Sequence, residues 1–285
     1  MDSKKIIELV IIFAILLVSA RVANEFAAQS VDDSLERNED GVIIGAETFY
    51  IDNNSTKSVL LLHGFGANPF SFQEMSTFFS DLGYNVYSPR LPGHGTSGFD
   101  LEKYSWKDWE AESERAYLSL RENSEEVYVL GYSMGGDLAL NLAKKYDIDK
   151  LVTMNAPYHL LTKLKYAIPI AYISQSYTID ILFKGTDREK KSKKYKIYPV
   201  LPIKSFSDLL ELVTNTKIDL ESIEEDILII QSKQDTLVDP ESANTIYRRV
   251  SSKNKRLVFL EYSDHIEIEE YDKEVTSQAL KEHLK

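Results

Sequence analysis

Cysteine is absent from this sequence of 285 residues, and histidine occurs only five times. The lack of cysteine excludes disulfide scaffolds, thiolate zinc sites, cysteine nucleophiles and an N-terminal cysteine modified by lipid. The histidines show no H-E-x-x-H spacing, and the chain has no Walker A loop. Its 45 acidic residues outnumber 33 basic ones, and the resulting net charge of −12 repels phosphate backbones. We therefore expect no metal, no cofactor and no nucleic-acid partner.

A long apolar segment lies near the start of the chain. The uncharged run Leu9–Ala20 suits the hydrophobic region of a signal peptide, whereas Ile6–Ala23 reaches the length of a membrane span only by including two charged residues. Lysines before the run and acidic residues after it place the N-terminus in the cytoplasm and the body outside. Residues 1–23 are thus predicted to be a signal peptide or a membrane anchor, and residues 24–40 a polar linker. A buried helix of the fold is the alternative.

Beyond residue 40, short β-rich runs alternate with helical patterns, which predicts an α/β fold with a mainly parallel sheet and helices on both faces. The predicted strands are Val42–Ile51, Ser58–His63, Asn85–Ser88, Glu126–Gly131, Lys150–Asn155, Asp226–Gln231 and Arg256–Glu261. The alternation breaks at about residues 157–205, where apolar and aromatic residues precede a lysine cluster. Within residues 161–205 ten basic residues face three acidic ones. We interpret residues 157–205 as a cap inserted in a domain that spans residues 41–285.

The motif Gly131-Tyr-Ser133-Met-Gly135 is a G-x-S-x-G that joins an apolar strand to a helical pattern. A sharp turn between strand and helix exposes the serine, and glycines relieve the crowding around it. Free N–H groups at the start of the helix favour developing negative charge. A serine hydroxyl needs a base to become a good nucleophile. Ser133 is therefore the predicted nucleophile, and a glycine-rich turn without a catalytic role is the alternative.

Candidates for the acid and the base follow two later predicted strands. Asp235 lies just beyond the strand that ends at Gln231, and His265 lies just beyond the strand that ends at Glu261. Loops after strand ends commonly carry reacting groups, and nucleophile, acid and base occur here in the chain order of α/β hydrolases. Asp239 is the second candidate for the acid, but it precedes a proline and is better explained as a helix cap.

A strand that ends in His63-Gly64-Phe65 supplies the remaining part of the predicted site. The backbone N–H groups of Phe65 and Met134 are the predicted donors to an oxyanion. A simple tight turn at Gly64 is the alternative. His94 is interpreted as a loop residue that packs near the site rather than as a second base.

In these motifs the sequence resembles the α/β-hydrolase superfamily, and within it the carboxylesterase and monoacylglycerol lipase group. The resemblance extends from Val42 to the C-terminus. It rests on Leu-Leu-His63-Gly64-Phe65, Arg90-Leu-Pro-Gly-His-Gly95, Gly-Tyr-Ser133-Met-Gly-Gly136, Gln234-Asp235-x-x-Val-Asp239-Pro-Glu-Ser-Ala-Asn244 and Ser263-Asp-His265. The chain departs from the family pattern at Asp264, where the family usually has glycine. A carboxylate beside the base favours a protonated ring.

The resemblance implies an esterase with Ser133 as nucleophile, His265 as base and Asp235 as acid, which forms an acyl-enzyme and needs no cofactor. Phe65 and Met134 are the implied oxyanion donors. Amide or thioester hydrolysis and acyl transfer are alternatives on the same triad, and a non-catalytic, membrane-tethered binding protein is a third. The expected partner is a small ester or an acylglycerol.

The cap is expected to cover the acyl pocket and to contribute the apolar residues Tyr166, Ile168 and Ile170. Its basic residues are candidates for contact with an anionic membrane surface, and a solvated loop is the alternative. They are Lys184, Arg188, Lys190, Lys191, Lys193, Lys194 and Lys196. The sequence does not predict an oligomeric state.

Overall fold

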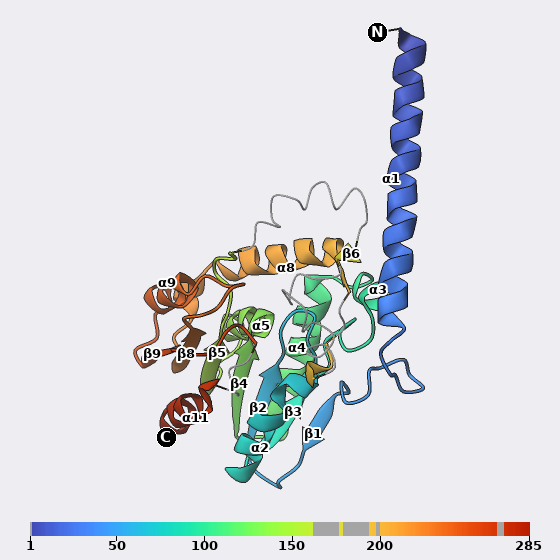
Figure 1. Ribbon diagram of the computed structural model, residues 1–285. Helices are drawn as coiled ribbons and strands as arrows, with labels where there is room; N and C mark the ends of the chain where they lie inside the picture. Colours follow the sequence, from blue (N-terminus) through green and yellow to red (C-terminus); the bar gives the residue numbers. More distant parts are fainter. Residues whose placement is uncertain (1, 162–176, 179–193, 198–199, 267–270) are drawn as a thin grey trace.

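A seven-stranded sheet forms the centre of the computed structural model, which describes residues 2–161, 177–178, 194–197, 200–266 and 271–285 (Figure 1). The strand order is β1-β3-β2-β4-β5-β8-β9, and only β1 is antiparallel to its neighbour. The strands are β1 (Phe49–Ile51), β2 (Lys57–Leu62), β3 (Asn85–Ser88), β4 (Glu126–Tyr132), β5 (Lys150–Met154), β8 (Ile227–Ser232) and β9 (Lys255–Leu260). The predicted mainly parallel sheet is confirmed.

Alternate residues of the parallel strands face two separate cores. On β2, Leu60 and Leu62 point into one core, whereas Val59 and Leu61 point into the other, and all four are fully buried. Because both faces of the sheet are covered, its central strands are apolar throughout. This explains the uninterrupted leucine run in β2.

Helices cover both faces of the sheet (Figure 1). One core includes side chains of α4, α5, α8 and α9, and the other includes side chains of α2 and α11. The helices of the body are α2 (Gln73–Asp81), α3 (Gly98–Leu101), α4 (Trp106–Arg121), α5 (Met134–Ala143), α8 (Ile203–Thr216), α9 (Glu241–Arg249) and α11 (Lys273–His283), with 3-10 turns at Pro69–Phe72 and Leu220–Ser222. A capping box begins α4, where the N–H of Ser105 donates to Oδ2 of Asp108 at 2.8 Å.

The first predicted strand, Val42–Ile51, is much shorter in the structure, where only β1 (Phe49–Ile51) is extended. Gly45 interrupts the apolar run with φ +91°, a left-handed conformation that ends an extended segment. Upstream of it, Ile43 donates its N–H to the carbonyl oxygen of Gly95 at 2.8 Å. Residues 42–48 therefore pack along the body rather than along the sheet.

Helix α1 (Ser3–Asp32) contains the apolar N-terminal segment and projects away from the body (Figure 1). By length and composition it is able to cross a membrane, and signal sequences share these features. The helix does not end near residue 23. It continues to Asp32, through the first part of the segment that we predicted to be a linker at 24–40.

The described part of the predicted cap contains β6 (Tyr177–Thr178) and β7 (Leu201–Pro202), which pair antiparallel and lead into α8. Tyr166, Ile168 and Ile170, the predicted lining of the acyl pocket, lie outside the described residues. Of the seven basic residues that we named as candidates for membrane contact, only Lys194 and Lys196 lie within them.

Candidate active site

Ser133 lies at the sharp turn between β4 and α5. Its backbone has φ 52° and ψ −122°, a conformation that residues other than glycine rarely adopt. The N–H of Ser133 donates to the carbonyl oxygen of Met154 at 2.8 Å, and the carbonyl oxygen of Ser133 accepts from the N–H of Gly136 at 2.8 Å. The strained serine is thus fixed from one side by the sheet and from the other by the helix.

The glycines on either side of Ser133 allow the first turn of α5 to approach the strands closely. A Cβ atom on Gly131 would lie 2.0 Å from the carbonyl oxygen of Gly135, and a Cβ atom on Gly135 would lie 1.9 Å from the carbonyl oxygen of Leu62. No side chain fits at these distances. The spacing of the G-x-S-x-G motif therefore has a steric cause in this fold.

His265 connects Ser133 to Asp235 through its two ring nitrogens. Nε2 of His265 lies 2.9 Å from Oγ of Ser133, and Nδ1 lies 2.6 Å from Oδ2 of Asp235. Both ring and carboxylate are nearly buried, with exposed fractions of 7% and 5%. With the ring neutral and Nδ1 protonated, Nε2 is free to accept the proton of the serine hydroxyl.

The carboxylate of Asp235 is held by further donors. Its Oδ1 accepts from the N–H groups of Leu237 and Val238, both at 2.8 Å, and its Oδ2 accepts from Nε2 of Gln231 at 3.3 Å. Hydrogen bonds of this kind fix the orientation of the carboxyl group. The other candidate, Asp239, instead accepts from the N–H of Glu241 at 3.0 Å at the start of α9, in agreement with the predicted role as a helix cap.

The turn at Gly64 lies directly against the nucleophile. A Cβ atom on Gly64 would lie 3.1 Å from Cβ and 3.6 Å from Oγ of Ser133. Phe65 directly follows this glycine, and Met134, the first residue of α5, directly follows Ser133. Each predicted oxyanion donor is thus the next residue after one of the two residues in contact.

Two buried histidines support the turn that carries Phe65. Nδ1 of His63 donates to the carbonyl oxygen of Gly64 at 3.0 Å, and Nε2 accepts from the N–H of Leu91 at 3.1 Å. The ring of His94 lies 5.0 Å from that of His63 and 6.1 Å from that of Phe65. Burial lowers the pKa of His63 to about 4 and the pKa of His94 well below its usual value, so both rings are neutral at pH 7. His94 thus packs near the site, as predicted.

Asp272 holds the loop that carries His265, and the sequence analysis did not identify it. Its Oδ2 accepts from the N–H of Tyr262 at 3.0 Å, from the N–H of Ser263 at 2.7 Å and from the hydroxyl of Ser263. Asp272 is 4% exposed and immediately precedes α11. An aspartate seven positions after the base forms no recognisable motif, so a single sequence offers no signal for it.

Asp264, which departs from the family pattern, closes the same loop. Its Oδ1 accepts from the N–H of Ile266 at 2.7 Å, and the bond spans the position of the base between them. The carboxylate is therefore engaged with the backbone on the far side of His265.

The chain also contains a G-x-G-x-x-G pattern, formed by Gly93, Gly95 and Gly98, which is a dinucleotide signature only between a strand and a long helix. Here it opens α3, a helix of a single turn. A Cβ atom on Gly98 would lie 2.5 Å from the carbonyl oxygen of Val200, so this glycine serves the packing of the cap. Among the described residues, no cluster of three or more His, Asp or Glu side chains is arranged to hold a metal.

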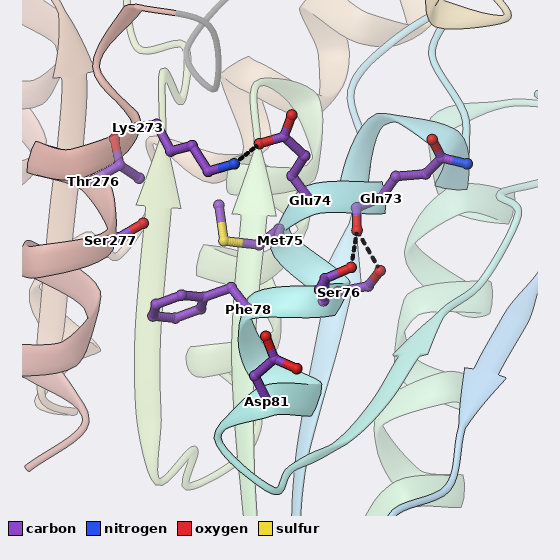
Figure 2. Close-up of a pocket in the computed structure, with 10 residues that line it drawn as sticks. Gln73, Glu74, Met75, Ser76, Phe78, Asp81, Lys273, Thr276 and Ser277 are labelled. Carbon is purple, nitrogen blue, oxygen red and sulfur yellow. Dashed lines mark hydrogen bonds and ion pairs between the residues drawn. The ribbon is translucent and has the colours of Figure 1, made fainter.

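A separate hollow of about 660 Å³ lies between α2 and α11 (Figure 2). Figure 2 shows Lys273 and Glu74 reaching toward each other across it, where they form an ion pair. None of the three residues of the triad lines this hollow. It lies beside α11, the helix that begins directly after Asp272.

A mainly parallel sheet with a serine at the turn after β4, an aspartate after β8 and a histidine after β9 defines the class of α/β hydrolases. The family model described as "Serine aminopeptidase, S33" matches residues 53–272, and the chain belongs to this family of α/β hydrolases.

Relatives of known name agree with the family. The chain is 34% identical over 240 residues to a thermostable monoacylglycerol lipase of a Bacillus species, and the aligned region covers 81% of this chain and 91% of the relative. It is 27% identical over 230 residues to a carboxylesterase of Bacillus subtilis, and the aligned region covers 80% of this chain and 92% of the relative. A solved structure of the metagenome-derived lipolytic enzymes LipS and LipT matches with a TM-score of 0.76 and 29% identity, covering 85% of this chain and 99% of that one. The resemblance found in the sequence is confirmed.

Proposed function

We propose that the protein hydrolyses carboxylic esters through an acyl-enzyme formed on Ser133. The observation that carries the proposal is the continuous chain of hydrogen bonds from Oγ of Ser133 through His265 to Asp235, at 2.9 and 2.6 Å. The relatives named lipase and carboxylesterase support an ester as the substrate.

In the first half of the proposed reaction, Oγ of Ser133 attacks the ester carbonyl carbon while Nε2 of His265 takes the hydroxyl proton. Asp235 stabilises the imidazolium that results. The N–H groups of Phe65 and Met134 donate to the carbonyl oxygen as it becomes negative. The bond to the alcohol oxygen then breaks, and that oxygen receives the proton from Nε2, leaving the acyl group on Ser133.

In the second half, water replaces the alcohol. Nε2 of His265 takes a proton from water as its oxygen attacks the acyl carbon, and the same two N–H groups stabilise the oxyanion. The bond to Oγ breaks, Oγ recovers the proton, and the carboxylic acid leaves. No cofactor takes part in the proposed steps.

The proposed substrate is an acylglycerol or another small ester with an apolar acyl chain. The name of the Bacillus monoacylglycerol lipase supports it, and so does the apolar composition of the cap around Tyr166, Ile168 and Ile170. Amide hydrolysis is the second candidate, because the family description names an aminopeptidase. The same acyl transfer to serine serves both substrates.

We further propose that α1 is a signal anchor that keeps the catalytic domain outside the cytoplasm. The exposed, uncharged run Leu9–Ala20 within α1 has lysines before it and acidic residues after it, which supports this orientation. The basic residues of the cap then contact anionic lipid, with about 1 kcal/mol for each side chain near the surface before screening by salt.

A series of p-nitrophenyl esters of increasing acyl length tests the substrate, with aminoacyl p-nitroanilides as the amide arm. We expect ester hydrolysis to exceed anilide hydrolysis and to depend on chain length. Ser133→Ala is the matched control in every arm. Faster cleavage of the anilides would assign the protein to amide chemistry instead.

A further inference from the structure

The carboxyl end of α1 is folded into the catalytic domain. Ala28 and Asp32 have exposed fractions of 0% and 3%, although most of the helix before them is exposed. The chain after the helix stays bound to the body, because the N–H of Ile44 donates to the carbonyl oxygen of Glu36 at 3.2 Å. The apolar helix therefore joins the domain without a free linker.

Arg37 ties this junction together. Its Nη2 donates to Oδ2 of Asp32 at 2.7 Å, and its Nη1 donates to the carbonyl oxygen of Asp32 at 3.0 Å. Its Nε and Nη2 also donate to the carbonyl oxygen of Thr96, at 3.1 and 3.0 Å. A planar guanidinium that uses several donors at once fixes the relative orientation of the groups that it contacts. We name Asp32, Arg37 and Thr96 the Arg37 clamp.

The clamp reaches a loop that belongs to the active site. Thr96 follows His94, whose ring lies 6.1 Å from that of Phe65, a predicted oxyanion donor. The carbonyl oxygen of Gly95, the residue before Thr96, accepts a hydrogen bond from the N–H of Ile43 at 2.8 Å. Hydrogen bonds therefore connect the end of the helix to the active-site loop.

The exposed apolar part of α1 ends close to the body. The fully buried Ala28 lies six positions after Val22, which is 59% exposed, a rise of about 9 Å along the helix. Phe26 lies between them and is 78% exposed, and aromatic side chains favour the level of lipid headgroups. A bilayer that contains the apolar part of α1 must therefore lie close to the domain.

The side of the domain that faces such a bilayer follows from the arrangement in Figure 1. Helix α1 projects toward the side on which α8 crosses the domain, and the carboxyl ends of β2 and β4 point to that side. Helix α1 also contacts β6 of the cap. The amino ends of the parallel strands lie at the opposite edge.

We infer that the Arg37 clamp holds the catalytic domain on a lipid bilayer in one orientation, with the carboxyl edge of the sheet, where Ser133 lies, facing the lipid. The inference rests on the proposed membrane insertion of α1. The binding partner is the bilayer surface. As a consequence, an ester that resides in the bilayer reaches Ser133 directly from the membrane, whereas a soluble ester reaches Ser133 from water.

The absence of cysteine allows a direct test of orientation. Thr214→Cys, at an exposed position of α8, and Thr56→Cys, at an exposed position just before β2 at the amino edge of the sheet, each create a single labelling site. The full-length variants carry a fluorophore in vesicles of phosphatidylcholine and phosphatidylglycerol that contain lipids with a headgroup quencher. We expect quenching at position 214 and none at position 56. Equal quenching at both positions, or stronger quenching at 56, would overturn the inference.

Arg37→Gln tests the clamp itself, and Asp32→Asn is a second variant that removes the ion pair and retains the size of the side chain. Arg121→Gln is the matched control, because Arg121 likewise binds a carboxylate, Oδ2 of Asp149 at 2.8 Å, and the carbonyl oxygen of Glu125, near the amino ends of β4 and β5. We expect Arg37→Gln and Asp32→Asn, but not Arg121→Gln, to reduce the difference in quenching between the two labels.

Activity provides the second readout. Arg37→Gln should lower hydrolysis of a monoacylglycerol embedded in vesicles on the order of tenfold, as orientation is lost, while p-nitrophenyl butyrate hydrolysis in solution stays unchanged. Equal loss on both substrates would indicate damage to the site and would overturn the clamp. Vesicle flotation separates the two proposals: a chain that does not float overturns the anchor and the clamp together, whereas a chain that floats with equally quenched labels overturns the clamp alone.

Discussion

Oδ2 of Asp272 accepts a hydrogen bond from the N–H of Ser263 at 2.7 Å, two residues before the base His265. The same oxygen also binds the hydroxyl of Ser263 and the N–H of Tyr262. The loop that carries the ring of His265 is thus held by a carboxylate at the start of α11. Asp272 touches none of the reacting atoms, and its role is to position the loop.

We expect Asp272→Asn to lower kcat by about tenfold with little change in KM, because an amide is a weaker acceptor for three donors and the ring becomes less well oriented. The rate of fluorophosphonate labelling of Ser133 should fall in parallel. Asp264→Asn is the matched control, since Asp264 bonds to the backbone of the same loop on the other side of His265. If Asp272→Asn melts at a lower temperature but retains full kcat at 25 °C, the residue is only structural.

Ser133→Ala should leave the fold intact and lower esterase turnover by about 10⁶, the scale seen when a triad nucleophile is removed. The hydroxyl is the only group of this side chain that the proposed reaction uses. Loss of fluorophosphonate labelling, followed on gels, checks the assignment together with the rate. A Ser133→Ala protein that still labels and hydrolyses esters would show that another residue is the nucleophile.

Asp235→Asn should lower turnover by about 10⁴, because the amide favours the wrong orientation or tautomer of the imidazole. Asp239→Asn should have little effect on turnover, since its carboxylate accepts only from the N–H of Glu241 at the start of α9 in the described structure. Steady-state kinetics on one p-nitrophenyl ester compare the two variants. The reverse ranking would reassign the acid.

The sequence predicts the turn and the strands that carry the proposed triad because their causes are local. The elbow around Ser133 needs glycine where a Cβ atom would lie within about 2 Å of backbone, so its spacing is visible in the sequence itself. Asp235 and His265 follow apolar strands that the alternation of elements reveals. Six of the seven predicted strands agree with the structure to within one residue at each end for the same reason.

The features that the sequence does not reveal depend on contacts between distant segments. Gly45 ends the extended run before β1, and its effect depends on packing against the loop that contains Gly95. The carboxylate of Asp272 reaches back to residues 262 and 263 across the position of the base. The continuation of α1 to Asp32 likewise depends on Arg37, which binds Thr96 far along the chain. A single sequence carries no pattern for such contacts.

The buried histidines predict a loss of stability in acid. Burial lowers the pKa of His63 to about 4 from 6.5, so the unfolded chain binds more protons between these values. The contribution of neutral His63 to the free energy of unfolding is fully present above pH 6.5 and decreases as the pH falls toward 4. The total decrease from this residue is about 3 kcal/mol. Urea unfolding at pH 7 and pH 5 should show the decrease.

The comparison variants for this experiment are His63→Gln and His159→Gln. His63→Gln should make the free energy of unfolding less dependent on pH, whereas His159→Gln, at an exposed position, should not. Unfolding free energies of His63→Gln that fall as steeply as those of the wild type would show that other groups cause the loss.

Gly135→Ala should prevent stable folding, whereas Gly41→Ala should cost only about 1–2 kcal/mol, the usual penalty for a left-handed alanine. A Cβ atom on Gly135 would lie 1.9 Å from the carbonyl oxygen of Leu62 and 2.8 Å from that of His63, so α5 must separate from β2. Gly41 has φ +74° but nothing within 4 Å of the added atom. The two variants thus separate backbone strain from steric overlap. Soluble yield and urea midpoints measure the difference, and a Gly135→Ala protein that folds with wild-type stability would show that the turn around Ser133 is less tightly packed than this geometry requires.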